Sequence, residues 1–184
     1  GWDAGAVTEG TSTNIPFVSP VAGTFPVTFN TLTYAAAPFF EILLNGEKMH
    51  MVHKENYQLD VDLTQGQDIT IEGLENIADW WIDADYLTKK ENGLYTFVPI
   101  TGKYRISANL KLNYFRVEVL SGNSVASLNA DGTGAIWVIG DNVGKPSLTD
   151  NYLGWNTDKA LCMAPVGAKK YQLTLVGGKN ISLD

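Results

Sequence analysis

Apolar and polar residues alternate along several stretches of the chain, with the period of two that is typical of a half-buried β-strand. The clearest stretch contains Tyr57, Leu59, Val61 and Leu63, each followed by a polar residue. Similar alternation occurs in five other stretches, around residues 25–29, 69–71, 104–106, 115–119 and 171–175. Helical spacing is confined to residues 74–81, where we expect at most a short helical turn. The pattern therefore predicts an all-β fold.

Turn residues separate the predicted strands. Asn45-Gly46 lies between the apolar runs FFEILL and EKMHMV, and Asn-Gly readily adopts the two positive φ angles of a type I′ hairpin turn. A second pair, Asn92-Gly93, precedes the run LYTFV. Strands at intervals of roughly 8 to 12 residues, separated by Gly, Asn and Asp, are typical of β-sandwiches. We therefore expect sandwich modules and no parallel βαβ units.

A stretch of small and polar residues, 121–134, divides the chain, and we interpret it as an interdomain linker. It separates a predicted β-sandwich over residues 15–120 from a second β module over residues 135–184. Residues 1–14 are expected to form a flexible amino-terminal segment. About 50 residues follow the linker, fewer than the roughly 60 at which a core becomes marginal. The second module is therefore expected to be incomplete or to pair its strands with the first.

Composition and charge narrow the class of function. The 184 residues include 13 basic and 20 acidic side chains, a net charge of −7 that disfavours nucleic acids and anionic membrane surfaces as partners. Cys162 is the only cysteine, which excludes an intrachain disulfide, and we expect it to be a small core residue. No apolar run approaches the roughly 18 residues that span a bilayer. The polar start is not a signal peptide, so an exported protein would be present here in its mature form.

The chain contains a series of characteristic phrases: DWWIDADYL, GLYTF, GKYRI, NYFRVEV, DGTGAIWVIGDNVGKP and GWNTDKALCMAPVGAKKYQL. From about residue 25 to its end, the sequence resembles the SusE/SusF-like modular surface lipoproteins of Bacteroidetes polysaccharide-utilisation systems. The resemblance implies an amino-terminal immunoglobulin-like domain and a following glycan-binding β-sandwich module. It also implies export, a lipid anchor at the outer membrane or cell surface, and polysaccharide capture without catalysis beside an outer-membrane transporter complex.

Sugar binding requires exposed aromatic rings beside planar hydrogen-bonding groups, because pyranose C–H faces stack on rings while hydroxyls need donors and acceptors. The glycine-containing loop DNYLGWNTDK supplies both. We expect Tyr152 and Trp155 to stack on a glycan. The hydrogen-bonding candidates are Asn151, Asn156, Asp158 and Lys159. The alternative is that Trp155 folds back and caps the second core.

Trp80 and Trp81 are the second candidate pair for glycan stacking. Adjacent residues of an extended chain point to opposite sides, so one ring would be buried and the other exposed. The exposed ring would bind glycan, contact another domain or be incidental surface. Trp137 lies among apolar neighbours and is expected to be buried outside any site.

Asp83 and Asp85 raise an enzymatic alternative. On a strand their Cα atoms would lie about 6.6 Å apart, and glycoside hydrolysis uses two carboxyl groups about 5 to 10 Å apart. Local acidic pairs are usually solvated, and the resemblance points instead to a turn in which one aspartate caps backbone amides. We therefore expect a protein that is not an enzyme, with a glycoside hydrolase fragment as the third alternative.

No metal or cofactor site is predicted. His50 and His53, the only histidines, are expected on opposite faces of a strand, and the acidic loop residues over 141–158 lack the ligand spacing of an EF-hand. The phrase GDNVGKP differs from a phosphate loop, because three residues separate its glycines and a proline follows its lysine. The favoured function is non-catalytic polysaccharide binding. Its main rival is a structural spacer or protein-docking module without glycan affinity.

Overall fold

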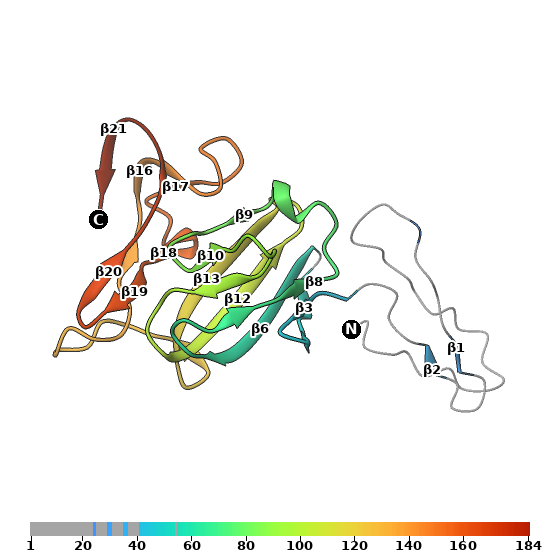
Figure 1. The fold of residues 1–184 in the computed structure, drawn as a ribbon. Helices are drawn as coiled ribbons and strands as arrows, with labels where there is room; N and C mark the ends of the chain where they lie inside the picture. The colour runs from blue at the N-terminus through green and yellow to red at the C-terminus, as the bar shows by residue number, and fades with distance from the viewer. Residues whose placement is uncertain (1–23, 25–28, 31–34, 37–40, 54) are drawn as a thin grey trace.

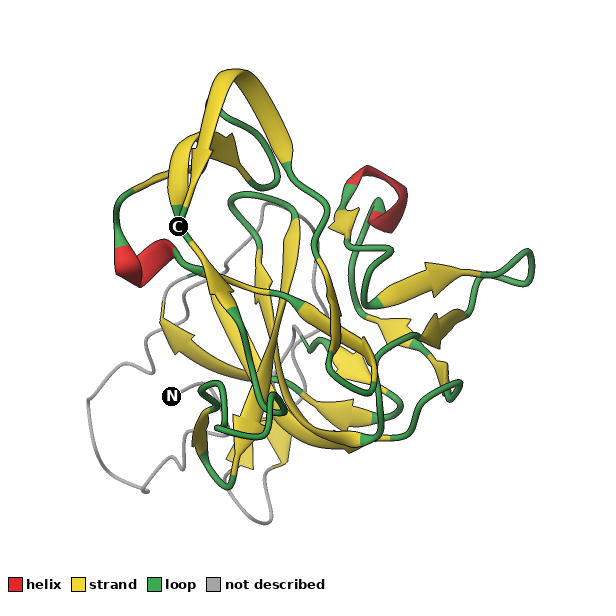
Figure 2. Cartoon of the chain, turned by 90° about the vertical axis from the view of Figure 1, so that its left-hand side faces the viewer, coloured by secondary structure: helices red, strands yellow, loops and turns green. Residues whose placement is uncertain are grey.

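The computed structural model describes residues 24, 29–30, 35–36, 41–53 and 55–184. The segment predicted to be flexible over residues 1–14, and most of the alternating stretch 25–29, lie outside these residues. Strands make up nearly all regular structure in the described ranges, and two short 3₁₀ turns, η1 (Ile77–Asp79) and η2 (Thr157–Lys159), are the helical elements there (Figure 2). The all-β prediction is confirmed, and η1 lies where a short helical turn was expected.

The largest sheet is built on three eight-residue strands, β6 (Asn56–Leu63), β12 (Gly102–Asn109) and β13 (Tyr114–Ser121) (Figure 1). β12 lies in the middle and pairs antiparallel with both neighbours along its length. Shorter strands complete this sheet: β5 (His50–His53), β14 (Ser124–Val125) and β9 (Trp81–Ile82), which runs parallel to β13.

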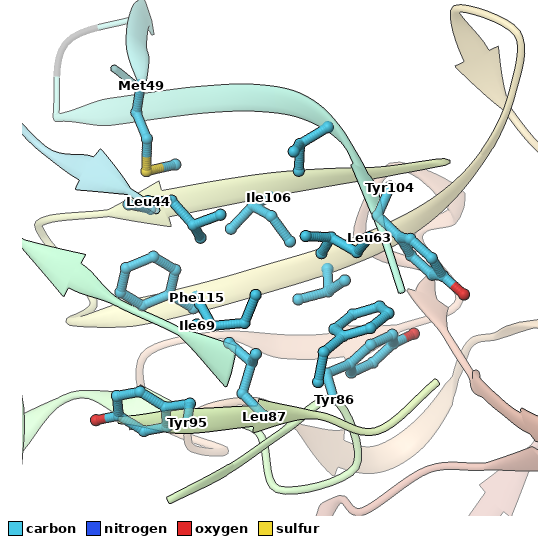
Figure 3. Close-up of a cluster of buried hydrophobic side chains, with 14 of the residues drawn as sticks. Leu44, Met49, Leu63, Ile69, Tyr86, Leu87, Tyr95, Tyr104, Ile106 and Phe115 are labelled. Carbon is cyan, nitrogen blue, oxygen red and sulfur yellow. The ribbon is translucent and has the colours of Figure 1, made fainter. Parts of the chain in front are cut away.

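Smaller sheets complete the described part of the first module. One is formed by β3 (Leu43–Leu44), β4 (Glu47–Lys48) and β8 (Ile71–Glu72), and another by β7 (Asp68–Ile69), β10 (Leu87–Lys89) and β11 (Tyr95–Phe97). A separate antiparallel pair, β1 (Phe29–Asn30) and β2 (Ala35–Ala36), precedes them. The six-stranded sheet and the two three-stranded sheets contribute side chains to one buried cluster, so the first module has a single core (Figure 3).

The alternation predicted over residues 57–63 is confirmed in β6. Tyr57, Val61 and Leu63 are buried in the core, whereas Asp60 and Asp62 are exposed. The exposed face is held by ion pairing, because the Arg105 guanidinium on β12 donates to both oxygens of the Asp60 carboxylate at 2.7 and 2.8 Å. This hydrogen bonding lowers the pKa of Asp60.

Asn45-Gly46 forms the predicted hairpin turn. Leu44 pairs with Glu47 across it, and the φ angles of Asn45 and Gly46 are 52° and 77°. The Asn45 side-chain oxygen also accepts a hydrogen bond from the Thr70 amide at 2.8 Å. The turn is therefore fixed to the neighbouring strand region as well as to its own hairpin.

Residues 135–184 form three small sheets beside the sandwich (Figure 1). β15 (Trp137–Val138) pairs with β18 (Leu161–Cys162), and β19 (Ala164–Gly167) pairs with β20 (Lys170–Gln172). β16 (Gly140–Gly144) lies between β17 (Tyr152–Gly154) and β21 (Val176–Leu183). None of these strands pairs with a described strand of the first module. Cys162 is buried, as predicted, and burial raises the pKa of its thiol.

The stretch interpreted as a linker, 121–134, consists of two tight turns. β14 folds back on the end of β13, and Leu128 then bridges Gly134. The second turn is closed by the Asp131 carboxylate, which accepts hydrogen bonds from the Thr133 amide at 2.9 Å and hydroxyl at 2.6 Å. The stretch that connects the two modules is therefore held in two turns by its own hydrogen bonds.

Two glycines with the same backbone conformation give a matched test of the close approach between β8 and the chain before β3. Gly73 and Gly66 have φ of 82° and 80°, but a Cβ at Gly73 would lie 1.8 Å from the Glu41 carbonyl oxygen, whereas one at Gly66 meets nothing within 4 Å. We expect Gly66→Ala to lower the free energy of unfolding by about 1–2 kcal/mol and Gly73→Ala to lower it by more than about 4 kcal/mol. Urea denaturation measures both, and equal losses would contradict the close approach.

Candidate functional site

Tyr152 and Trp155 are the exposed aromatic residues of the described chain. Their side chains are 40% and 57% exposed, and every other aromatic residue with a described side chain is buried or half-buried. They lie three positions apart, on β17 and in the loop that follows it. Trp155 does not fold back as a cap on the second core, and both rings are accessible to a ligand.

The Tyr152 ring is held in place by its surroundings. Its hydroxyl donates a hydrogen bond to the Asp141 carboxylate on β16. Gly154 has a φ of 57°, and a Cβ there would lie 3.0 Å from the Tyr152 ring, so the ring lies against bare backbone. The Lys159 ammonium donates to the Tyr152 carbonyl oxygen at 2.9 Å. The ring therefore has one main position before any ligand binds.

The predicted hydrogen-bonding residues divide into two groups. Asn151 and Lys159 donate to the backbone of their own loop, Asn151 to the Lys145 carbonyl oxygen at 2.8 Å. Asn156 and Asp158 are exposed beside Trp155 in sequence, and the Asn156 side-chain oxygen caps η2 by accepting from the Asp158 amide at 3.0 Å. Asn156 and Asp158 are thus the two predicted hydrogen-bonding residues with exposed side chains, and Thr157 between them is exposed as well.

The structure gives Trp80 and Trp81 a packing role. Both are half-buried, so the prediction that one of them is exposed is wrong. The Trp80 ring packs on the core, 5.1 Å from the ring of Phe115, and Trp81 lies in β9, which pairs parallel with β13. The Trp81 indole nitrogen is buried without a hydrogen-bond partner among the described residues. Trp80 has an extended backbone but ends η1, and β9 begins only at Trp81, so the two residues do not belong to one regular strand with two opposite faces.

Trp137 also differs from the prediction. It is half-buried, and its indole N–H donates to the Ala126 carbonyl oxygen at 2.8 Å, which fixes the ring across the connection between the modules. One side of the ring lines a pocket. Sequence reasoning placed Trp137 wholly in a core because its neighbours in the chain are apolar.

Asp83 is buried and forms an ion pair with Lys145, which is also buried. Its second oxygen accepts a hydrogen bond from the Asp85 amide at 3.0 Å, which is the turn-capping role that the resemblance implied. Burial raises the pKa of the Asp83 carboxyl, and the adjacent Lys145 ammonium opposes the rise. Lys145 belongs to the phrase that resembled a phosphate loop, and its charge is used inside the protein.

The Asp85 carboxylate likewise accepts hydrogen bonds, from residues far along the chain. One oxygen accepts from the Gln172 amide at 2.6 Å and the Thr174 hydroxyl at 3.1 Å, and the other accepts from the Thr174 backbone amide. All oxygens of Asp83 and Asp85 are therefore bonded to protein groups in a buried position. This pair is not placed to act as the acid and nucleophile of a glycosidase.

The described residues contain no group of three or more His, Cys, Asp or Glu side chains that could hold a metal ion. His50 and His53 are both exposed on β5, on either side of an irregularity in its pairing with β6. In the same part of the chain, no helix has the length and apolar character needed to cross a membrane.

Two family models match the sequence. One, described as a domain of unknown function (DUF5125), covers residues 1–128. The chain belongs to the DUF5125 family. The other, a domain of unknown function (DUF5121), covers residues 131–183 and includes the Tyr152–Trp155 loop. No curated protein and no solved structure matches the chain.

The DUF5125 and DUF5121 parts are joined by further hydrogen bonds. The Tyr86 hydroxyl donates to the Cys162 carbonyl oxygen at 2.7 Å, and the Ile100 amide donates to the Pro165 carbonyl oxygen at 2.9 Å. With the bonds of Asp83 and Asp85, these contacts come from the DUF5125 part and end on Lys145 just after β16, on β18, β19 and β20, and on Thr174 after β20. The DUF5121 part is therefore docked along most of its length.

Substitution of Asp83 and Lys145 tests whether their buried ion pair holds the DUF5125 and DUF5121 parts together. Asp83→Asn and Lys145→Met each leave one partner buried without its counter-charge, so we expect each to lower the free energy of unfolding by about 3–5 kcal/mol. The double variant should lose less than the sum of the two single losses, with a coupling energy of at least about 1 kcal/mol. Chemical denaturation measures the cycle.

The exposed pair Lys90 and Asp68 is the matched control for this cycle. Asp68→Asn and Lys90→Met should each change stability by less than about 1 kcal/mol, because solvent screens the charges. Additive losses at Asp83 and Lys145, similar to those at the control pair, would show that the buried pair does not join the two parts.

Proposed function

We propose that this DUF5125-family protein binds carbohydrate without catalysis, and that Tyr152 and Trp155 stack against the sugar rings of a polysaccharide. The observation that carries the proposal is their exposure, since they are the accessible rings of the described chain and share one loop. Aromatic faces of this kind match the C–H faces of pyranoses. A Tyr152 ring held by its hydrogen bond to Asp141 before binding loses little conformational entropy when the ligand arrives.

The polar residues near Trp155 suit the hydroxyls of a neutral glycan. Asn156 offers an amide donor, and Asp158 offers a carboxylate acceptor on the exposed side of η2. Hydroxyl groups both donate and accept hydrogen bonds, so a mixed set of side chains can orient a sugar without requiring charge on it. We propose Asn156 and Asp158 as the hydrogen-bonding residues of this site.

The cellular setting is part of the same proposal. The resemblance of the sequence to SusE/SusF-like lipoproteins is the basis for proposing an exported, lipid-anchored protein at the outer membrane or cell surface, beside a transporter complex. In that setting the DUF5125 part would act as a support that holds the DUF5121 loop toward the glycan. The described part of the support has no exposed aromatic residue.

Affinity electrophoresis tests the function. Wild type, Trp155→Ala and Tyr152→Ala are run through gels that contain α- and β-glucans, mannans, xylans or host glycans. We expect at least one glycan to retard the wild type and each variant to bind it roughly 10- to 30-fold more weakly, the effect of losing about 2 kcal/mol of aromatic contact.

Leu128→Ala is the matched control, because Leu128 is an exposed apolar residue outside the loop. It should be retarded like the wild type. Equal retardation of wild type and Trp155→Ala would overturn the site. If no glycan retards the folded wild type, the rival function, a spacer or protein-docking module, replaces the proposal.

A further inference from the structure

A pocket of about 470 Å³ lies between the two parts of the chain, apart from the exposed rings of Tyr152 and Trp155. Arg116 and Glu118 on β13 and Val125 on β14 form the wall from the DUF5125 part. The wall from the DUF5121 part consists of Trp137, Ile139, Thr157, Ala160 and Asp184. The volume of the pocket falls within the range of about 300–1,000 Å³ that is usual for small-molecule sites.

One side of the pocket is apolar and rigid. The Trp137 ring cannot turn freely, because its N–H donates to the Ala126 carbonyl oxygen and it packs beside the buried Cys162 cluster. Val125 and Ile139 extend this surface. A fixed indole with aliphatic neighbours matches the C–H face of a sugar ring.

The rest of the lining contains charged side chains, two of which form an ion pair with each other. The Arg116 guanidinium donates to the Ala160 carbonyl oxygen at 2.8 Å and lies 2.9 Å from a Glu118 carboxylate oxygen. With Glu118 and Asp184 the lining has two carboxylates and one guanidinium. The excess of acceptors favours a ligand with hydroxyl donors and disfavours an anionic ligand.

We infer that this pocket is a second carbohydrate subsite, which binds one or two uncharged sugar units between the DUF5125 and DUF5121 parts. A sugar ring stacks on Trp137, and its hydroxyls bond to Glu118 and Thr157. The inference rests on the proposed function for the class of ligand, but it stands on different residues. Thr157 belongs to the loop that carries Trp155, so one loop contributes to both subsites.

Calorimetric titration with short neutral saccharides tests the subsite. The probes are maltose, cellobiose, mannobiose and xylobiose, added to the full chain. Val125→Trp fills the pocket from its exposed rim, and Thr157→Val removes a hydroxyl with little change of shape. We expect at least one disaccharide to bind the wild type, to bind Val125→Trp more than 10-fold more weakly, and to bind Thr157→Val a few-fold more weakly.

Val52→Trp is the matched control, since Val52 is 56% exposed on β5 and Val125 is 49% exposed on β14. It adds the same ring elsewhere and should bind like the wild type. Disaccharide binding that is unchanged in Val125→Trp overturns the pocket. Gel retardation by a polysaccharide without binding of any disaccharide also overturns the pocket, but leaves the Tyr152–Trp155 proposal standing. Disaccharide binding that only Val125→Trp and Thr157→Val weaken supports the pocket, even if no polysaccharide retards the chain.

Discussion

The buried ion pair between Lys145 and Asp83 is the interaction on which the rest of the structure depends. Lysine is almost never buried without a partner, because removing its charge from water is costly. The DUF5121 part has only small clusters of buried residues of its own, such as Val143, Leu153 and Leu161. Its position is therefore set by docking on the DUF5125 part, through Lys145 and the acceptors of Asp85.

The Asp83–Lys145 ion pair is also connected to the proposed glycan loop, through the chain on either side of Lys145. Lys145 follows β16, and Asp141 in that strand accepts the hydrogen bond of the Tyr152 hydroxyl. The Asn151 side chain donates to the Lys145 carbonyl oxygen, which ties the start of β17 to this ion pair. The loop with Tyr152 and Trp155 thus follows a strand whose end is held by the ion pair of Lys145 with Asp83, so its position depends on a contact outside the proposed site.

Local patterns in the sequence predicted several strands and one hairpin turn correctly, although the strand expected over residues 171–175 ends at Gln172. The alternation over residues 57–63 and the Asn45-Gly46 hairpin depend on neighbouring residues alone, and the structure contains both. The loop with Tyr152 and Trp155 was also a sequence-based candidate, because aromatic and amide residues occur together there. Glycan binding by the two rings stays a prediction.

Contacts between distant residues could not be predicted. Asp83 and Asp85 resemble a solvated acidic pair until Lys145, Gln172 and Thr174, more than 60 positions away, are brought beside them. The environment of Trp137 likewise depends on the hairpins of the stretch 121–134. Such contacts cannot be predicted from the residues that are neighbours in a single sequence.

The most direct test of the central claim is a titration of ¹⁵N-labelled protein with a soluble glycan, followed by the indole N–H signals in NMR spectra. The chain has five tryptophans, so each indole signal can be assigned by single substitution. If Trp155 stacks on sugar, its signal should shift with ligand concentration, while the signals of Trp80 and Trp81 stay in place. A glycan that binds and moves only the signals of Trp80 or Trp81, or moves none, would contradict the account.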